Sequence, residues 1–470
     1  MSAANDLAFL SIGEAAPLIR EKKLSPVDWT QALIDRISRY DTKLNAFLRF
    51  TPDIALADAR RAEAEIAAGH WRGPLHGVPY GLKDIIDYAG LPTTAHSAIL
   101  KDNVATSDAS VTARLRAAGG VFMGKLSTHE FALGGPCFDL PWPPARNPWN
   151  RDYFCGGSSS GSGVATAAGF LPFAIGTDTG GSVRNPSTMC GVVGIKPTYG
   201  LVSRRGVFPL AYSLDHVGPL TRTVRDNAIV LNAIAGHDGS DPGSVARPGV
   251  DHTALLARGV KGLRIGWLRH FYEEDIKADP QMGAAVDAAV ATLRDLGAQV
   301  TEVSTIPLSR FQACNRVIMG SESYAIHEKW LRERPQDYGD VTRQRLLYGA
   351  MYSASDYINA LRLRSRYTAE FHALFGDVDV IVTASAHEPA CRIDDPEACE
   401  FIYSRQARAP FNVTGSPAIA VPAGFSREGL PLGIQIVGAP YDEATVYRVG
   451  AAYEAATSWT ERHPACLTEG

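Results

Sequence analysis

The sequence predicts an α/β protein in which one large domain is built around a continuous sheet. Apolar strand segments alternate with helical segments, as where strands at 263–267 and 299–303 flank a helix that runs through Asp287 to Leu296. No internal repeat, heptad run or low-complexity linker divides the 470 residues. We therefore expect a single domain over residues 1–470, with its more variable half between residues of about 240 and 410.

Two helices are expected near the start of the chain. Ser25 and Pro26 form a helix-start signal. Apolar residues then recur at helical spacing, namely Trp29, Leu33, Ile34 and Ile37. A second helix, rich in Ala and Glu, runs from Asp53 to Ala68 and ends at Gly69. The first helix should pack on the core, and the second should face solvent.

The remaining elements are predicted by short apolar runs between turns. A turn at 73–77 and an apolar run lead into Lys83, an unusual place for a charged side chain. A helix over 110–120 precedes a strand at 121–124. Three further strands are expected at 378–383, 418–421 and 432–437, each bounded by Gly, Pro or Asp.

Composition and charge exclude several classes of protein. The chain is 45% apolar and 20% charged with a net charge of −4, so it has no basic surplus that would attract nucleic acid. It has no apolar run long enough for a membrane-spanning helix and no signal peptide. The seven cysteines show no C-x-x-C spacing and indicate reduced thiols. We expect a cytoplasmic protein.

Two neighbouring segments rich in Gly and Ser are the strongest functional signal. The first, 156–163, opens an Ala-rich helical stretch, so its N–H groups would lie at a helix N-terminus. In the second, 176–184, Gly180 and Gly181 let the backbone approach a ligand closely, just before Ser182. Successive N–H groups beside a serine are the geometry that an oxyanion hole needs.

Over about residues 70–225 the chain resembles the amidase signature family. The resemblance is carried by GVPYGLKDI, GGSSSGSGVATAAG and GTDTGGSVRNPSTMCGVVGIKPTYG, with similar flanks in SLDHVGPLTRTVRD, FNVTGSPAIAVPAGF and GLPLGIQIVG. It implies a single α/β domain whose central mixed sheet is covered by helices on both faces. It also implies an amidase that acts on a small amide. We further expect no cofactor and no metal, and a homodimer is one assembly that these expectations permit.

Carried over residue by residue, the resemblance implies a catalytic triad. Ser182 would be the nucleophile, Ser158 a bridging serine on a cis peptide bond, and Lys83 the base. The oxyanion hole would be formed by the N–H groups of Thr179, Gly180, Gly181 and Ser182, and the loop would be supported by Ser159, Asp178 and Arg184.

The chemistry of the residues agrees with these roles. A serine hydroxyl needs a neighbouring base, and none of the twelve histidines lies inside the two Gly/Ser segments. Lysine has an ordinary pKa of about 10.4, and burial beside Val78, Leu82 and Ile85 would lower the pKa of Lys83 towards the range in which it accepts a proton. The relay would then protonate the departing amine before water hydrolyses the acyl-enzyme.

Other catalytic patterns in the sequence are weaker. The segment 157–161 matches G-x-S-x-G, which would make Ser159 a nucleophile, but the residues before it form a poor strand. His129 and Glu130 begin an H-E-x-x-H motif that lacks its second histidine, so we expect no zinc site. No nucleotide-binding G-x-x-x-x-G-K-[ST] motif occurs.

The substrate is predicted only by composition. Aromatic residues and prolines between 131 and 149 suit an apolar acyl or aryl pocket, and an origin in core packing is an equally good interpretation. The candidate contacts are Phe131, Ala132, Phe138 and Trp142, with Trp149 at the end of the segment. We expect aryl or aliphatic amides, and esters or carbamates could undergo the same acyl transfer.

Two other functions use the same scaffold. The main alternative is the glutamine-hydrolysing A subunit of a tRNA-dependent amidotransferase, which works only with partner subunits. Segment 321–328 lacks the tyrosine- and glycine-containing stretch associated with glutamine-specific members, so a free-standing hydrolase is favoured. A catalytically inactive binding protein is disfavoured because Lys83, Ser158 and Ser182 are all present.

Overall fold

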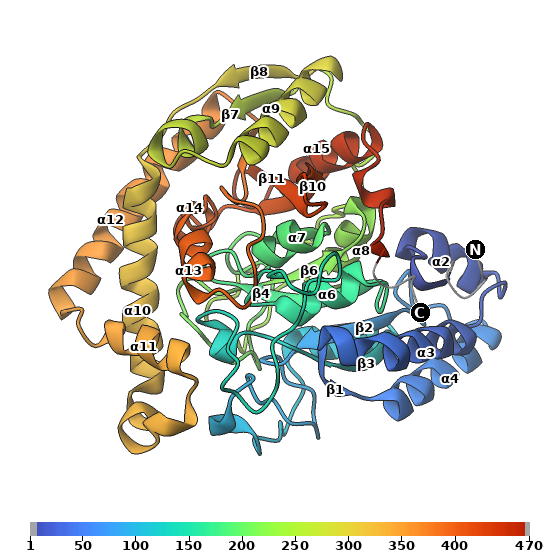
Figure 1. Cartoon of the computed structure of the whole chain (residues 1–470). Coiled ribbons are helices and arrows are strands. Elements are labelled where there is room, and N and C mark those ends of the chain that lie inside the picture. Colours follow the sequence, from blue (N-terminus) through green and yellow to red (C-terminus); the bar gives the residue numbers. More distant parts are fainter. Residues whose placement is uncertain (1–6, 466–470) are drawn as a thin grey trace.

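A computed structural model describes residues 7–465 and shows one sheet that runs through the whole molecule (Figure 1). Its eleven strands lie in the order β1-β3-β2-β4-β6-β5-β10-β11-β9-β7-β8. The strands are β1 (Phe47–Phe50), β2 (Pro79–Lys83), β3 (Val121–Leu126), β4 (Phe173–Asp178), β5 (Val193–Lys196), β6 (His216–Thr221), β7 (Arg264–Trp267), β8 (Gln299–Glu302), β9 (Val380–Ala384), β10 (Ala418–Phe425) and β11 (Pro431–Gly438).

The sheet is mixed. Strands β3, β2 and β4 are parallel to one another, and so are β9, β7 and β8. The strands between these two groups pair antiparallel, from β4 through β6, β5, β10 and β11 to β9. The predicted single domain with a mixed central sheet is therefore confirmed for the described residues.

Helices cover both faces of the sheet. A Cβ on Gly433 of β11 would meet Thr188 in α7 at 3.2 Å, whereas one on Gly438 of the same strand would meet Val446 in α15 at 2.5 Å. Because alternate strand residues point to opposite faces, α7 and α15 lie on opposite sides of the sheet. The helices are α2 (Ile12–Arg20), α3 (Pro26–Leu44), α4 (Pro52–Ala67), α5 (Ser110–Ala117), α6 (Ser160–Ala167), α7 (Arg184–Cys190), α8 (Val224–Ile234), α9 (Pro280–Asp295), α10 (Leu308–Glu333), α11 (Asp340–Gly349), α12 (Ala354–Ala373), α13 (Pro396–Ser404), α14 (Ala409–Val413) and α15 (Glu443–Ala455).

The helices of the variable half extend along one side of the molecule. Figure 1 shows α10, α11 and α12 beside one another at the periphery, away from β1 and β3. Helix α10 also contacts α14. Helices α10, α11 and α12 therefore lie on one side of the molecule, and α10 connects them to α14.

Most of the predicted elements occur close to their expected bounds. Helix α3 begins after Ser25, whose side chain accepts hydrogen bonds from the N–H groups of Val27 and Asp28, and α4 ends one residue before its expected end at Ala68. Helix α4 is half-buried rather than solvent-facing throughout, since Ala55, Ala59, Ala62 and Ile66 are covered. The apolar run before Lys83 is strand β2, and β1, β2, β4, β5 and β6 were not expected as strands from the sequence.

The parallel strands position the functional segments. Strand β2 ends at Lys83 and its parallel neighbour β4 ends at Asp178, so both residues lie at the same edge of the sheet. Helix α6 begins at Ser160, within the first Gly/Ser segment, and α7 begins at Arg184, shortly after Ser182. The fold therefore brings both segments and the lysine together.

Three sequence expectations concern the whole chain. Among the described residues, no helix is long and apolar enough to cross a membrane. Six cysteines are free thiols, and Cys466 lies outside the described residues. In the same part of the chain, no group of three or more His, Cys, Asp or Glu side chains is placed to hold a metal ion.

Candidate active site

Lys83 lies at the centre of the site, fully buried at the end of β2. Its Nζ donates a hydrogen bond to Ser158 Oγ at 2.7 Å and another to Thr177 Oγ1 at 2.8 Å. No salt bridge pairs Lys83 with a carboxylate among the described residues, so its partners are two neutral hydroxyl groups. The structure therefore joins the first Gly/Ser segment to the lysine.

The environment of Lys83 favours its neutral form. Burial lowers the pKa of Lys83 to about 7, while the negative charges of Asp178 and Asp215 act in the opposite direction. At neutral pH a large fraction of the amine is therefore unprotonated. A neutral amine hydrogen-bonded to a serine hydroxyl is able to act as a general base.

Ser158 is held between the lysine and helix α6. The peptide bond from Gly157 to Ser158 is cis, and Ser158 is buried. Its carbonyl accepts hydrogen bonds from the N–H groups of His129 and Ser160. Gly157 is needed beside it because a Cβ there would come within 2.1 Å of the His129 ring. The backbone of this segment is thus fixed on both sides of the serine.

Ser182 differs from Lys83 and Ser158 in its exposure. It is partly exposed, as is Gly180, while the other two residues are buried. The Ser182 carbonyl accepts a hydrogen bond from the Ser159 N–H at 3.2 Å, so the two Gly/Ser segments lie against each other. Of Lys83, Ser158 and Ser182, only Ser182 is therefore partly open to solvent.

The loop before Ser182 presents backbone donors. The N–H groups of Thr179, Gly180 and Ser182 donate no hydrogen bond to any described residue. The N–H of Gly181 differs, because it donates to Asp178 Oδ1 at 2.8 Å. Three of the four expected oxyanion-hole donors are therefore available to a ligand in this structure, and that of Gly181 is already bonded.

Asp178 and Arg184 hold this loop in place. The Asp178 carboxylate accepts hydrogen bonds from the N–H groups of Gly181, Val183 and Arg184 and from the Arg184 guanidinium. Although burial opposes ionisation, the Arg184 guanidinium and the other donors hold the pKa of Asp178 well below its usual range. Ser159 contacts the same strand, since its Oγ donates to the Thr177 carbonyl at 3.2 Å.

Three residues of the site were not identified from the sequence. Thr177 accepts a hydrogen bond from Lys83 Nζ. It lies within the second Gly/Ser segment, and that position could have marked it as a site residue. Asp215 accepts a hydrogen bond from Thr179 Oγ1 at 2.6 Å, and burial raises its pKa to about 6. Asn315 of α10 donates to the Thr179 carbonyl at 3.2 Å, a contact between distant segments that no local pattern indicates.

A pocket of about 530 Å³ borders the relay. Its lining includes Ile85, Phe208, Thr177 and Asp215. Of these, Thr177 accepts a hydrogen bond from Lys83, and Asp215 accepts one from Thr179. The lining is mostly apolar, with charged groups at Arg204 and Asp241 that form a salt bridge with each other. Lys83, Ser158 and Ser182 are not among its lining residues, so the pocket approaches the relay through Thr177.

The aromatic residues expected at the substrate pocket occupy different places. Phe131 is buried in an aromatic cluster with Phe208, His327, Trp330 and Tyr338. Phe138 is 55% exposed, and Trp149 packs against Phe425. The main chain is unusual at Phe131 and Ala132, where φ is +51° and +61° in the left-handed region. These two residues mark a constrained loop beside the site.

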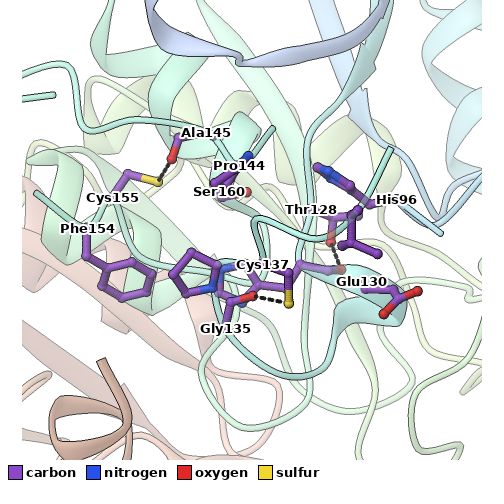
Figure 2. Close-up of a pocket in the computed structure, with 13 residues that line it drawn as sticks. His96, Thr128, Glu130, Gly135, Cys137, Pro144, Ala145, Phe154, Cys155 and Ser160 are labelled. Carbon is purple, nitrogen blue, oxygen red and sulfur yellow. Dashed lines mark hydrogen bonds between the residues drawn. The ribbon is translucent and has the colours of Figure 1, made fainter. Parts of the chain in front are cut away.

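The segment 128–145 also encloses a very small cavity, which Figure 2 shows. It measures about 10 Å³, near the lower limit for one water molecule. Phe154, Pro144, Cys137 and Cys155 lie around it, and Cys155 Sγ donates to the Ala145 carbonyl at 3.2 Å. Trp142 is not among the lining residues, and its carbonyl lies 3.0 Å from Nε2 of His96, which does line the cavity. This cavity is too small for an aryl group.

The weaker patterns in the sequence correspond to structural roles. Ser159 precedes helix α6, and its hydroxyl contacts only the Thr177 backbone. His129 is buried, and its Nδ1 lies 3.2 Å from the Tyr403 hydroxyl. Glu130 accepts hydrogen bonds from Ser97 Oγ and from the Gly339 N–H. Neither pattern forms a second catalytic centre.

Comparison with known proteins supports the family resemblance. The model of the Amidase family matches residues 28–447. This chain belongs to the amidase signature family. A relative from Chloroflexus aggregans, named as the A subunit of a glutamyl-tRNA(Gln) amidotransferase, is 38% identical over 98% of this chain and 99% of its own length.

Solved structures show the same fold. One chain of a vestigial protein complex, described as revealing the evolutionary origins of an s-triazine catabolic enzyme, has a TM-score of 0.88 at 34% identity and covers 95% of this amidase-family chain and 98% of its own. The peptide amidase from Stenotrophomonas maltophilia has a TM-score of 0.85 at 30% identity, covering 97% and 98% of the two chains. The family member described here is therefore an α/β enzyme of the amide-cleaving class.

Proposed function

We propose that this chain hydrolyses a carboxylic acid amide to an acid and an amine or ammonia, through an acyl-enzyme on Ser182. The observation that carries the proposal is the 2.7 Å hydrogen bond between Lys83 and Ser158, in a buried setting that lowers the pKa of Lys83 to about 7. Ser182 is partly exposed beside N–H groups that have no acceptor among residues 7–465. These contacts support Lys83 as the base and Ser158 as the relay, and the hydrogen bond from the Ser159 N–H to the Ser182 carbonyl supports Ser182 as the nucleophile beside them.

In the acylation step, Ser182 Oγ attacks the carbonyl carbon as its proton passes to Ser158, whose own proton passes to neutral Lys83. The N–H groups of Thr179, Gly180 and Ser182 stabilise the negative charge that develops on the carbonyl oxygen. When the tetrahedral intermediate collapses, the C–N bond breaks and the relay returns a proton to the leaving nitrogen.

Deacylation uses the same groups in the opposite direction. A water molecule loses its proton through Ser158 to Lys83 as it attacks the acyl carbon. The acid is released when the C–O bond to Ser182 breaks, and Ser182 Oγ takes the proton back. Esters and carbamates contain the same electrophilic carbonyl, so we propose that the same acyl transfer extends to them.

The comparisons support a glutamine-hydrolysing role in an amidotransferase more strongly than the free-standing hydrolase favoured from the sequence. Relatives that match this chain over nearly their whole length at 38% identity are named as amidotransferase A subunits. A chain of similar structure belongs to a vestigial protein complex. We therefore propose glutamine as the first substrate to test, with the chain working together with partner proteins.

A free-standing amidase is the second candidate. It is supported by the likeness to the peptide amidase, which covers 97% of this chain. Phe208, which packs against Phe131, lines the pocket that borders the relay, and an aromatic side chain there suits an apolar substrate. For this candidate, short aliphatic amides, anilides and C-terminally amidated peptides are the compounds to test.

One panel separates the two candidates. The purified chain is assayed for release of ammonia or amine from glutamine, butyramide, acetanilide and an amidated dipeptide, with Ser182→Ala as the control. Turnover of the simple amides by the chain alone supports the free-standing enzyme. Glutamine turnover that appears only on co-expression with the other amidotransferase subunits supports the first candidate. Equal turnover by Ser182→Ala would overturn the acyl-enzyme proposal.

A further inference from the structure

Cys391 and Cys399 form a pair of thiols at the beginning of helix α13. Their Sγ atoms lie 3.5 Å apart, within the range of a thiol hydrogen bond. Cys399 Sγ also lies 3.6 Å from the Arg392 carbonyl, next to Cys391 in the chain. Among residues 7–465, no other two cysteine Sγ atoms are in contact with each other. These two thiols are therefore placed to react together.

The two thiols differ in exposure and in acidity. Cys391 is half-buried and open to small solutes, whereas Cys399 is 5% exposed. The hydrogen bond from Cys399 lowers the pKa of Cys391, and the same contact, together with burial, raises the pKa of Cys399. Because the thiolate is the nucleophilic form of cysteine, Cys391 is the thiol that reacts first with an oxidant. Cys399 lies in contact with it and is able to react second.

The two cysteines lie on parts of the chain that are held separately. Cys399 is in the first turns of α13, where its N–H donates to the Asp395 carbonyl at 3.0 Å, while Cys391 precedes the helix. The sulfur atoms of a disulfide are about 2.05 Å apart, so the two Sγ atoms must approach each other by about 1.5 Å. Bond formation therefore draws Cys391 and the beginning of α13 together.

The segment at Cys391 pairs with the chain that leads into the first Gly/Ser segment. The Cys391 carbonyl accepts a hydrogen bond from the Phe154 N–H at 2.8 Å, and the Ile393 N–H donates to the Asp152 carbonyl at 2.9 Å. Phe154 is fully buried and lies four positions before Ser158. A shift of the main chain at Cys391 is therefore transmitted towards Ser158.

Helix α13 contacts the residues that hold the same serine. Tyr403, in the last turn of the helix, packs against the rings of Phe154 and His129, and its hydroxyl lies 3.2 Å from His129 Nδ1. The His129 N–H in turn donates to the Ser158 carbonyl at 3.0 Å. Both parts of the chain that a disulfide would join thus contact the support of Ser158.

We propose that Cys391 and Cys399 form a reversible disulfide when the protein meets a peroxide, and that this disulfide slows amide hydrolysis by displacing the residues that hold Ser158. Formation of the disulfide is independent of the proposed function, whereas its effect on turnover rests on that function. A displacement of about 1 Å in a catalytic group costs about 100-fold in rate, so a fraction of the sulfur movement at Ser158 is sufficient.

The reaction consumes one molecule of hydrogen peroxide. The Cys391 thiolate attacks one peroxide oxygen, so that an S–O bond forms, the O–O bond breaks, and hydroxide leaves and takes up the proton that Cys391 had released. The Cys399 sulfur then attacks the sulfur of this sulfenic acid. The S–S bond forms, the S–O bond breaks, and the hydroxyl leaves as water with the Cys399 proton. The thiols lose two electrons, and the peroxide is reduced to two water molecules.

The first experiment locates the bond. The full chain is treated with hydrogen peroxide, its free thiols are blocked with iodoacetamide, and it is digested with trypsin without reduction. Because trypsin cleaves after Arg392, the two cysteines lie on different peptides, which mass spectrometry should find linked before treatment with dithiothreitol and separate after it. Absence of this link, or a link from either cysteine to Cys155, would overturn the proposal.

The order of the two steps is tested with single variants. In Cys399→Ser the sulfenic acid on Cys391 has no thiol to react with, so we expect dimedone to label Cys391. In Cys391→Ser we expect Cys399 to remain unlabelled, because it is buried and its pKa is raised. Labelling of Cys399 at the rate seen for Cys391 would contradict the assignment of Cys391 as the first thiol to react.

The second experiment measures amide hydrolysis before peroxide treatment, after it, and after dithiothreitol. We expect kcat of the wild type to fall about 10-fold and to recover on reduction, while Cys391→Ser and Cys399→Ser keep their turnover in peroxide. Cys314→Ser is the matched control, since this buried thiol of α10 donates to the Ala360 carbonyl, and it should respond as the wild type does. Thermal unfolding checks that each variant is folded.

The two experiments distinguish this inference from the proposed function. If no amide is cleaved in either thiol state and Ser182 is not acylated, the proposed function fails, whatever the peptides show. If amides are cleaved and the disulfide forms without a change in turnover, or does not form, only the inference about Cys391 and Cys399 fails.

Discussion

Lys83 Nζ lies 2.7 Å from Ser158 Oγ, and Lys83 is completely buried. In the proposed mechanism, this relationship allows a lysine, which is ordinarily protonated at neutral pH, to act as the base. Burial removes the hydration that stabilises an ammonium, and Ser158 lies between the amine and the second Gly/Ser segment. In the proposed mechanism, this serine transmits the basicity of the lysine to Ser182, which is partly exposed.

Removing either Lys83 or Ser158 from this relay should slow catalysis strongly. We expect Lys83→Ala and Ser158→Ala to lower kcat for amide hydrolysis by about 10²- to 10⁴-fold, the usual contribution of general-base catalysis. Ser162 lies in the same segment and donates only to the Ile175 carbonyl, so Ser162→Ala is a matched serine control. The release of ammonia from a primary amide measures all three. Loss of activity in Ser162→Ala alone would contradict this assignment of the relay.

The pH dependence should follow the protonation of Lys83. Because the neutral amine is the active form and its pKa is about 7, kcat/KM should be low at acid pH and rise to a plateau above neutrality. The profile is best measured with an uncharged amide, so that the substrate itself does not titrate. A rate that is constant between pH values of about 5 and 9 would show that a different group is the base.

Asp215 gives a second test of the same pKa. Its negative charge raises the pKa of Lys83, so Asp215→Asn should shift the acid limb of the rate profile to lower pH. Asp241 lines the same pocket but pairs with Arg204, and Asp241→Asn should leave the limb in place. A shift of the limb to higher pH in Asp215→Asn would be opposite in sign to this expectation.

Gly181 should be far less tolerant of substitution than Gly180. Gly181 has φ +129°, and a Cβ there would meet Arg408 Nε at 2.5 Å, whereas a Cβ on Gly180 would meet Asn315 Oδ1 at 3.4 Å. We expect Gly181→Ala to lower the free energy of unfolding by about 1–3 kcal/mol or more, and Gly180→Ala by less than about 1 kcal/mol. Chemical denaturation of both variants measures the difference. Equal stability of the two would show that the loop adjusts freely.

Asp178 should contribute stability that depends on pH. Its folded-state pKa is depressed, so its contribution is present above the ordinary aspartate pKa of about 3.9 and is lost as the pH falls below that value. Asp178→Asn leaves Arg184 buried without its partner, and we expect a loss of about 3–5 kcal/mol at neutral pH. The difference in unfolding free energy from the wild type should shrink at acid pH. A difference that grows on acidification would contradict this account.

Several elements of the fold were predictable from local pattern. Helix α3 has a serine cap and helical apolar spacing, and β9 and β11 are apolar runs bounded by turn residues. Strand β6 was not predicted because it contains Gly218 and Pro219, which locally favour a turn. It is a strand because β4 and β5 pair with it on either side. Tertiary pairing thus outweighs local propensity at the centre of the sheet.

The candidate site was only partly predictable, because some of its contacts depend on tertiary structure rather than on local sequence. Lys83, Ser158 and Ser182 lie in ordered motifs, and their meeting point follows from the resemblance to the family. Asn315, Arg408 and Asp215 reach the site from other segments, and no spacing relates them to Ser182. The bond of the Gly181 N–H to Asp178 likewise depends on how the loop folds back on its own strand.

The most direct test of the acyl-enzyme is the site at which a serine-directed reagent attaches. A fluorophosphonate reacts with an activated serine and remains attached, so peptide mass spectrometry locates the nucleophile. We predict one adduct, on Ser182, that forms rapidly at mildly alkaline pH in the wild type and far more slowly in Lys83→Ala. An adduct on Ser159, or labelling of Ser182 at the same rate in both proteins, would contradict the proposed roles of Ser182 and Lys83.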